Sequence, residues 1–486
     1  MKKIITALFL IVVCILSVSA YENEIVKVFL DNETVIFDIE PQIIGGRTMV
    51  PLRAVFEKMG ATVEWDDPTQ TVTATKGDKT VVCSIGSTAM YINGTESQMD
   101  VAPLLLETET QSRTLVPARF VAEAFDGKVL WSDKKREVYI FSIENSTEED
   151  YNLAKYTIHF EDINSTEYKV IDGSAKPGFV GRWFEKEIDG VKHTVTLSDG
   201  STFYFLTDGA EGFNVNFTVI TTGKTPFFAY SVDGSDPVRQ LITEPYVKLP
   251  DNGIHNVCIW ADGMTEGEGK WGLEKGFALK DVTVESGTVC GVMPQKKIIA
   301  YYGDSITEGI RALNMYADSE GNSATNAYPY HCSKALGTLT HSVGYGATGI
   351  ISIGSFNTMI KAIDNISYEV KEIEGFMPDV IVVNHGTNDN GYTDNGFKKA
   401  LIETLDRLVE KYPDVPVFYA IPFGQYKAAV IREVCAAYPT ITVVETEGWG
   451  ITFTDSLHPD VNGAKIAGEK LAEAIKASLG EEFFKN

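Results

Sequence analysis

From Lys296 to the end of the chain, short apolar segments alternate with stretches that have the periodicity of helices. The apolar segments read KIIAYYGDS, LTHSVGYG, DVIVVNHGTND, VPVFYAIPF and TITVVET. Helices are predicted between and after them at residues 328–336, 355–363, 396–411 and 462–477. Short, mostly apolar strands that alternate with helices are typical of a parallel sheet covered on both faces. In such a sheet, functional residues gather at the carboxyl ends of the strands.

Four polar motifs follow these strands or lie close to their ends. They are Gly303-Asp304-Ser305, Gly344-Tyr345-Gly346-Ala347-Thr348, Gly386-Thr387-Asn388-Asp389 and Asp455-Ser456-Leu457-His458-Pro459. A serine between a strand and a helix has an exposed hydroxyl and an N–H at a helix start, which suits a nucleophile that handles an anion. Glycines without side chains let a substrate approach the backbone closely. The sequence therefore predicts a nucleophilic site at this edge of the sheet.

In order and spacing, the four motifs resemble the sequence blocks of the SGNH (GDSL-type) hydrolase family. The resemblance implies that Ser305 attacks an ester carbonyl and that His458 takes its proton and later protonates the leaving alcohol. Asp455 would orient the imidazole and stabilise its charged form. Because Asp455 and His458 are three positions apart, one loop can bring both to the same side of the site.

The resemblance also implies an oxyanion hole formed by the backbone N–H groups of Ser305 and Gly346 and by the side-chain amide of Asn388. Gly344 competes with Gly346 for this role, and Gly346 is preferred because Gly-Ala-Thr matches the family's second block better.

Other polar residues near the motifs are interpreted as structural. The resemblance assigns Asp304 to holding the turn before the nucleophile, and Asp389 is expected to brace the Asn388 loop. His385 is expected to bond the loop backbone only. Trp449 could stack on a sugar ring or belong to the core.

Between about Lys155 and Met293, alternating segments are punctuated by Asp-Gly pairs, a pattern typical of a β-sandwich. The segments read YTIHF, KHTVTLS, TFYFLT, NVNFTVIT, FFAYSVDG, HNVCIWAD and ALKDVTVES. Such a sandwich could bind sugar or act as a spacer, and Trp183 and Tyr204 could be exposed aromatics or core residues.

The order of sandwich and SGNH domain resembles carbohydrate esterase family two, in which a jelly-roll precedes the catalytic domain. GFVGRWFE from Gly178, DGSTFYF from Asp199 and IIAYYGDSITEG carry the resemblance. It implies removal of O-acetyl groups from extracellular carbohydrate or polysaccharide.

Residues 24–145 contain an internal duplication. GRTMVPLRAVFEKMGATVEWD begins at Gly46, and SRTLVPARFVAEAFDGKVLWS begins 66 residues later at Ser112, with nine of 21 positions identical. Repeated units of this kind usually bury each other's apolar faces. The block resembles the copper amine oxidase N-terminal-like domain, although it has no histidine for copper. Arg53 and Arg119 are interpreted as scaffold residues, and the block as a contact to cell wall or surface.

Residues 1–20 have the three parts of a secretory signal peptide: Lys2 and Lys3, an apolar run, and small residues up to Ala20. An uncleaved anchor is the alternative. No later stretch has eighteen apolar residues, so we expect a secreted chain without a membrane span; association with the cell surface stays open. After removal of Cys14, five cysteines remain, and Cys258–Cys290 is the one pair that could bridge, although buried free thiols are favoured.

These features predict four segments: a signal peptide (1–20), a duplicated α+β module (24–145), a jelly-roll-like β-sandwich (153–293) and an α/β SGNH hydrolase domain with a parallel sheet flanked by helices (296–486). Asn145–Asn152 is predicted to be a linker.

The net charge of −25, from 42 Lys+Arg and 67 Asp+Glu, argues against a nucleic-acid partner. Neither a metal nor another cofactor is predicted, since the other histidines are scattered and the triad needs none.

Three functions stay open from the sequence. The first is a secreted serine esterase that deacetylates carbohydrate. The second is an SGNH lipase or lysophospholipase, which would need a long apolar acyl groove that no apolar loop marks. The third is a non-catalytic cell-surface carbohydrate-binding protein, which the loss of a triad residue would favour.

Overall fold

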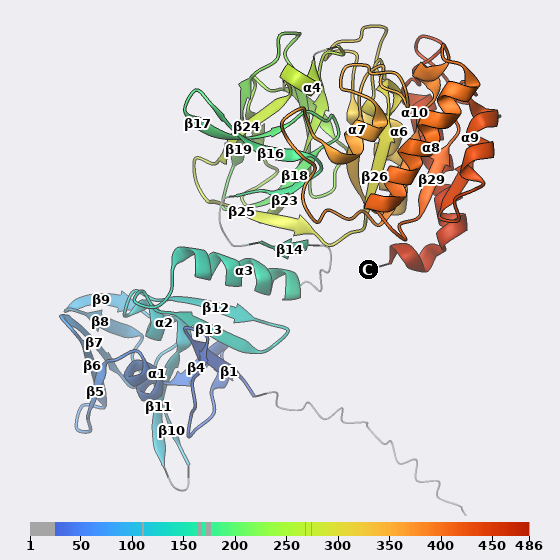
Figure 1. Ribbon diagram of the computed structural model, residues 1–486. Helices are drawn as coiled ribbons and strands as arrows, with labels where there is room; N and C mark the ends of the chain where they lie inside the picture. The colour runs from blue at the N-terminus through green and yellow to red at the C-terminus, as the bar shows by residue number, and fades with distance from the viewer. Residues whose placement is uncertain are drawn as a thin grey trace, which may run out of the picture. The chain divides into compact units, whose positions relative to one another are not determined.

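The structure is a computed structural model that describes residues 25–108, 111–162, 168–171, 176–267, 269–273 and 275–485 (Figure 1). The predicted signal peptide lies outside these residues. Contacts within the chain divide it into two compact units, Met1–Tyr151 and Asn152–Asn486.

The first unit is an α+β module with three sheets, ordered β12-β13-β1-β2, β10-β11-β4-β3 and β5-β6-β7-β8-β9. Its elements are β1 (Lys27–Leu30), β2 (Glu33–Thr34), β3 (Gln42–Ile44), β4 (Arg47–Pro51), α1 (Leu52–Lys58), β5 (Thr62–Asp66), β6 (Thr71–Lys76), β7 (Lys79–Ser84), β8 (Ala89–Ile92), β9 (Thr95–Gln98), β10 (Leu104–Glu107), β11 (Ser112–Pro117), α2 (Ala118–Glu123), β12 (Lys128–Ser132) and β13 (Glu137–Phe141).

The duplication appears as the repeated order β4-α1-β5 and β11-α2-β12. Strands β4 and β11 pair antiparallel with Val50 opposite Val116, which are equivalent positions in the two copies. One apolar cluster contains both valines, so the copies share a core, as the repeat predicts. Arg53 donates to the carbonyl of Val63 at 3.0 Å and pairs with Glu57, which agrees with a scaffold role.

The first predicted strand of the sandwich, residues 156–160, is wrong. The two compact units divide between Tyr151 and Asn152, inside the predicted linker, but most of the linker is helical. Helix α3 (Glu148–Asp162) covers most of this stretch. Thr147 and Asp150 form a reciprocal cap, in which Asp150 N–H donates to Thr147 Oγ1 at 3.1 Å and Thr147 N–H donates to Asp150 Oδ2 at 2.8 Å. This helix start lies inside the polar run that was interpreted as a linker, and no Gly or Pro breaks the run before residue 162.

Two antiparallel sheets face each other in the second unit, ordered β14-β25-β18-β23-β20-β21, with β15 also paired to β18, and β16-β17-β24-β19-β22. The strands are β14 (Tyr168–Val170), β15 (Gly178–Val180), β16 (Trp183–Ile188), β17 (Val191–Thr196), β18 (Thr202–Asp208), β19 (Gly212–Val219), β20 (Phe227–Val232), β21 (Val238–Leu241), β22 (Tyr246–Lys248), β23 (His255–Gly263), β24 (Phe277–Thr283) and β25 (Thr288–Pro294), with the short helix α4 (Lys270–Leu273) before β24.

Side chains from both sheets form one apolar core, so this region is a β-sandwich, as predicted. The pair Asp189-Gly190 joins β16 to β17 with φ of 50° and 75°, the left-handed pair of a tight hairpin turn. Trp183 and Tyr204 are 7% and 9% exposed and belong to core clusters, which removes them as surface sugar platforms.

None of the five described cysteines that follow the signal segment forms a disulfide. Cys258 on β23 and Cys290 on β25 flank β18, where they pair with Tyr204 and Leu206. Two strand spacings, about 10 Å, separate them, which is more than a disulfide can span.

A five-stranded parallel sheet, ordered β27-β26-β28-β29-β30, follows the sandwich (Figure 1). Its strands and helices are β26 (Ile298–Gly303), α5 (Ser305–Glu308), α6 (Tyr328–Leu336), β27 (Leu339–Gly344), α7 (Met359–Asp364), β28 (Val380–Asn384), α8 (Asp394–Lys411), β29 (Val417–Ala420), α9 (Ala428–Cys435), β30 (Ile441–Val444) and α10 (Val461–Leu479). Short 3-10 turns lie at Ala324–Asn326, Thr387–Asp389 and Glu481–Phe484.

Successive side chains of β26 point to opposite faces of the sheet. Ile299 and Tyr301 pack in the cluster that includes α6 and α10, and Ala300 and Tyr302 pack in the cluster that includes α7, α8 and α9. Burial on both faces explains the continuous apolar runs of the strands.

Three of the four predicted helices lie where expected, at α6, α8 and α10. The helix predicted over 355–363 begins only at Met359, because Thr358 before it is extended, with φ −71° and ψ 159°. Helix α9 was not predicted. It follows Lys427, which has a φ of 57° and supplies no capping side chain. Among the described residues, no helix is both long enough and apolar enough to cross a membrane.

Candidate active site

The loop after β26 places Ser305 at the first position of α5. Asp304 caps this helix, since its Oδ1 accepts a hydrogen bond from the N–H of Ile306 at 3.0 Å. A Cβ on Gly303 would lie 1.8 Å from Thr307 Oγ1, so only glycine fits before the turn. The sharp turn is built from the residues of the first motif.

The last motif brings His458 to Ser305. The Nε2 atom of His458 lies 2.9 Å from Ser305 Oγ, and its Nδ1 atom lies 2.9 Å from Asp455 Oδ2. The other carboxylate oxygen of Asp455 accepts the backbone N–H of His458 at 2.8 Å. Ser456, with a φ of 68°, lets the loop fold back tightly enough for both contacts. A hydroxyl, an imidazole and a carboxylate thus form one chain of hydrogen bonds, which can transfer the hydroxyl proton.

Asp455 has a further partner that the sequence analysis missed. The Nη1 atom of Arg311 lies 2.5 Å from Asp455 Oδ2, the oxygen that also faces the imidazole. Although burial favours the neutral acid, hydrogen bonds from His458 and Arg311 hold the pKa of Asp455 far below its usual range. The carboxylate therefore stays ionised. Arg311 follows the first motif closely, but it has no partner that can be recognised from the sequence.

The N–H groups of Ser305 and Gly346 donate to no other residue in the described part of the chain. Gly344 differs, because it belongs to β27 and a Cβ there would lie 2.7 Å from the backbone nitrogen of Glu308. Because Gly344 has no side chain, β27 can pack closely against α5. The Asn388 amide donates to the carbonyl of Thr348 at 3.0 Å, so it lies beside the loop of Gly346.

Asp389 braces the neighbouring loop rather than its own. Its carboxylate accepts the N–H groups of Ile350 and Ile351, each at 2.8 Å, and that of Ser352 at 3.0 Å. His385 is buried, and burial lowers the pKa of its ring to about 4. These side chains fix the loops around the serine.

Comparison with known families agrees with this arrangement. Residues 301–481 match the GDSL-like lipase/acylhydrolase family, and residues 29–140 match the copper amine oxidase N-terminal domain. The C-terminal part of the chain is a GDSL-type hydrolase domain. No curated protein matches the chain.

Three solved structures are similar to the chain. An acetyl xylan esterase from the rumen bacterium Butyrivibrio proteoclasticus is 15% identical, with a TM-score of 0.51 over 65% of this chain and 99% of that chain. A family two carbohydrate esterase from Cellvibrio japonicus is 17% identical, with a TM-score of 0.51 over 65% of this chain and 98% of the other. A family two carbohydrate esterase from Clostridium thermocellum in complex with cellohexaose is 17% identical, with a TM-score of 0.50 over 63% of this chain and 100% of that chain.

At these identities the likeness concerns the fold. The covered share of the chain is larger than the GDSL-type match, so the shared fold extends into residues before 301.

The sandwich contributes directly to the environment of the GDSL-type site. Lys270 forms a buried ion pair with Glu308, one helical turn after Ser305, and both side chains are 1% exposed. Tyr345, between the two glycines of the second motif, donates or accepts a hydrogen bond with Ser198 at 2.8 Å. Its ring stacks on Phe356 with centroids 4.2 Å apart.

A second buried ion pair joins the sandwich to the hydrolase domain. Arg182 lies 2.5 Å from Glu372, donates to Tyr345 Oη at 3.2 Å and has no exposed surface. Although burial favours the neutral acid, Arg182 and His341 hold the pKa of Glu372 far below its usual range. These long-range partners have no sequence motif, so the sequence analysis did not identify them.

Trp449 packs as a half-buried core residue, with its ring 6.3 Å from that of Phe423.

In the described ranges, no group of three or more His, Cys, Asp or Glu side chains could hold a metal ion.

Proposed function

We propose that this protein is a secreted serine esterase that removes O-acetyl groups from carbohydrate or polysaccharide. The observation that carries the esterase assignment is the position of His458, whose ring nitrogens lie 2.9 Å from Ser305 Oγ and 2.9 Å from Asp455 Oδ2. In this geometry the imidazole can take the proton of Ser305 while the carboxylate holds the ring in the required tautomer.

In the first half of the reaction, Ser305 Oγ attacks the ester carbonyl and His458 takes the hydroxyl proton. The N–H groups of Ser305 and Gly346 and the amide of Asn388 stabilise the oxyanion. The imidazolium then protonates the leaving alcohol, and an acetyl-serine remains. In the second half, His458 takes a proton from water, the hydroxide attacks the acetyl group, and acetate leaves as Ser305 regains its proton.

The carbohydrate part of the proposal is supported by the chemistry of proteins with the same fold. One similar structure is an acetyl xylan esterase, and another was determined with cellohexaose. Export is supported by the sequence of residues 1–20, and a role of residues 24–145 at a cell surface is part of the same proposal.

The test compares p-nitrophenyl acetate, butyrate and octanoate as substrates of the chain without residues 1–20 and of its Ser305→Ala variant. We expect acetate to be preferred and the variant to lose at least about 10³-fold in kcat. Ser478→Ala, an exposed serine on α10, is the matched control and should keep full activity.

A preference for octanoate would instead favour a lipase. Equal activity of the wild type and Ser305→Ala would contradict the esterase assignment and favour a binding protein.

A further inference from the structure

A loop of the sandwich reaches the catalytic site of the hydrolase domain. This loop, Met264–Gly267, follows strand β23 and is fixed at two points to the hydrolase domain. The amide of Asn322 donates to the carbonyl of Met264 at 2.6 Å, and the N–H of Glu266 donates to the carbonyl of Ala317 at 2.9 Å. The position of Glu266 is therefore set by contacts to the backbone of its loop and does not depend on its own side chain.

The side chain of Glu266 lies against Gly346. A Cβ built on Gly346 would lie 2.8 Å from both Cγ and Oε1 of Glu266. The carboxylate is thus next to the residue whose N–H we assign to the oxyanion hole, and a side chain at residue 346 would require the side chain of Glu266 to move.

Within the described ranges, the carboxylate of Glu266 accepts no hydrogen bond and forms no ion pair. It is half-buried, and its charged neighbours are of both signs. Burial and the carboxylates of Glu308 and Asp455 raise its pKa, whereas Arg311 and Lys270 act in the opposite direction. The ionised form lacks a hydrogen-bond donor, and a donor on a ligand would stabilise it.

A carboxylate in this place is unfavourable for the ester chemistry alone. Negative charge develops on the carbonyl oxygen in the transition state, and a second negative charge beside it opposes that development. The oxygens of Glu266 are not among the buried polar atoms without a partner in the described residues, so they are open to solvent and to a ligand. A hydroxyl of the substrate can take the place of water there and donate to the carboxylate.

We propose that Glu266 accepts a hydrogen bond from a free hydroxyl of the substrate alcohol, on the carbon next to the one that carries the ester. This inference rests on the proposed esterase function and narrows its substrates to acetyl esters of polyols that keep a neighbouring hydroxyl free. A hydroxyl-to-carboxylate hydrogen bond is charge-assisted, and such bonds are about twice as strong as neutral ones. The acyl group would lie in the hydrolase domain while the sandwich recognises the alcohol.

The test uses two small esters that differ only in that hydroxyl, trans-2-hydroxycyclohexyl acetate and cyclohexyl acetate. The measured quantity is the ratio of their kcat/KM values in the wild type, Glu266→Gln and Glu266→Ala. We expect the wild type to prefer the hydroxy ester at least about tenfold. Glu266→Ala should lose most of this preference, and Glu266→Gln should lie between the two.

Turnover of p-nitrophenyl acetate, which has no hydroxyl, gives a second readout with the opposite sign. Removal of the negative charge in Glu266→Ala should raise it about two- to tenfold. A rise also shows that the variant is folded. Glu285→Ala removes an exposed carboxylate from the loop between β24 and β25, and it should change neither readout.

An unchanged ratio in Glu266→Ala, while Ser305-dependent turnover of p-nitrophenyl acetate persists, overturns the inference and leaves the proposed function intact. A parallel loss on both esters also overturns it, since that result indicates a general role in folding or catalysis. Absence of any Ser305-dependent ester hydrolysis overturns the proposed function and this inference together.

Discussion

At the scale of single residues, the proposed active site combines aspartates in opposite environments. Asp455 is surrounded by donors, which hold its pKa far below the usual range. Asp304 is fully buried, and burial together with the nearby Asp389 raises its pKa to about 7, even though the N–H of Ile306 favours the ionised form. The same side chain is thus an ionised partner of the imidazole in one position and a helix cap that resists ionisation in the other.

Asp304→Asn should change the pH dependence of stability. The folded-state pKa of Asp304 is about 7 and its ordinary value is 3.8, so the wild type loses stability as the pH rises from about 4 to 7. Asparagine keeps the cap and cannot ionise. The unfolding free energy of the variant relative to the wild type should therefore be higher at pH 8 than at pH 5, by about 1–3 kcal/mol.

Urea unfolding at the two pH values measures this difference, and Asp460→Asn is the matched control. Asp460 caps α10 through an oxygen 2.7 Å from the N–H of Gly463, and its pKa is lowered because donors outweigh burial. The stabilising effect of ionised Asp460 is complete above about pH 4. The unfolding free energy of Asp460→Asn should therefore differ from that of the wild type by the same amount at pH 5 and pH 8. The interpretation of Asp304 is wrong if both variants respond alike.

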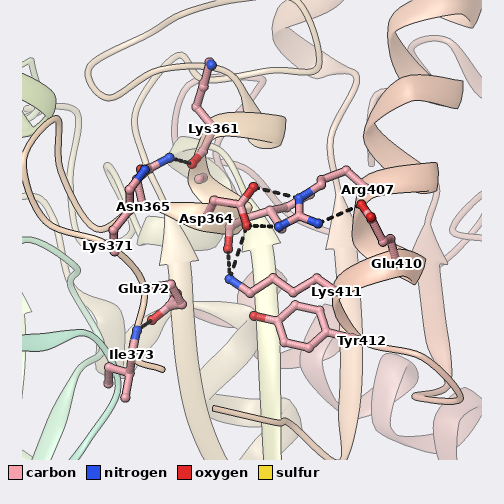
Figure 2. A network of polar contacts seen from close by, with 12 residues as sticks. Lys361, Asp364, Asn365, Lys371, Glu372, Ile373, Arg407, Glu410, Lys411 and Tyr412 are labelled. Atoms are coloured by element: carbon pink, nitrogen blue, oxygen red, sulfur yellow. Dashed lines mark hydrogen bonds and ion pairs between the residues drawn. The ribbon is translucent and has the colours of Figure 1, made fainter. Parts of the chain in front are cut away.

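At the scale of elements, the loops that carry the site are held by the helices behind them. The segment after β27 contains Gly346 and leads into α7, and α7 is tied to α8. Figure 2 shows Arg407 and Lys411 of α8 converging on Asp364 at the end of α7. The guanidinium of Arg407 makes two hydrogen bonds to Asp364, at 2.8 and 2.6 Å, and a third at 2.7 Å to Glu410.

The Arg407–Asp364 pair should couple α7 to α8 without affecting the chemistry. Both side chains are about one-third exposed, at 34% and 32%, so solvent screens the pair. A double-mutant cycle with Arg407→Ala and Asp364→Ala should give a coupling free energy of about 0.5–1 kcal/mol in urea unfolding. The kcat of the single variants on p-nitrophenyl acetate should stay near that of the wild type.

A matched cycle on Arg432 and Glu445, an ion pair that is more exposed at 41% and 55%, should give a smaller coupling. Both pairs are bidentate, so equal coupling in the two cycles would mean that the lower exposure of the Arg407–Asp364 pair adds nothing.

At the scale of the whole molecule, the hydrolase domain and the sandwich share their buried charges. Lys270 and Arg182 belong to the sandwich, and their partners Glu308 and Glu372 belong to the hydrolase domain. Removing one partner of a buried ion pair typically costs about 3–5 kcal/mol, because the other charge stays buried without compensation. A fragment without the sandwich would keep Glu308 and Glu372 without these cations, and the two losses together would be a large fraction of the stability of a single domain.

We therefore expect residues 296–486 alone to be unable to fold into an active esterase. Residues 147–486, which keep the Thr147 cap of α3 and every residue of the proposed site, should retain kcat/KM on p-nitrophenyl acetate within about twofold of the full chain. Circular dichroism and turnover of the two fragments measure both expectations. An active, cooperatively folded fragment 296–486 would contradict the structural role of the sandwich.

The sequence alone determined the parts of the protein that depend on local chemistry. Apolar periodicity located the parallel strands and helices α6, α8 and α10, because burial on one or both faces leaves a repeating pattern. The Asp-Gly pairs located turns between strands of the sandwich, two of them hairpins, and the four motifs located Ser305, His458 and Asp455, since each motif supplies its own turn or cap. The helix over 148–162 could have been found from its capping residues, which were interpreted as a linker.

Only the tertiary structure decided which distant residues meet. Arg311 reaches Asp455 across 144 positions, and Lys270 reaches Glu308 across 38. Glu266 lies on Gly346 only because β23 ends at the hydrolase domain. The strand pattern of the sandwich was equally compatible with a spacer that does not contribute to the site. The reason is physical: a buried ion pair depends on the packing of two surfaces, and neither charge alters the local periodicity or turn chemistry around it.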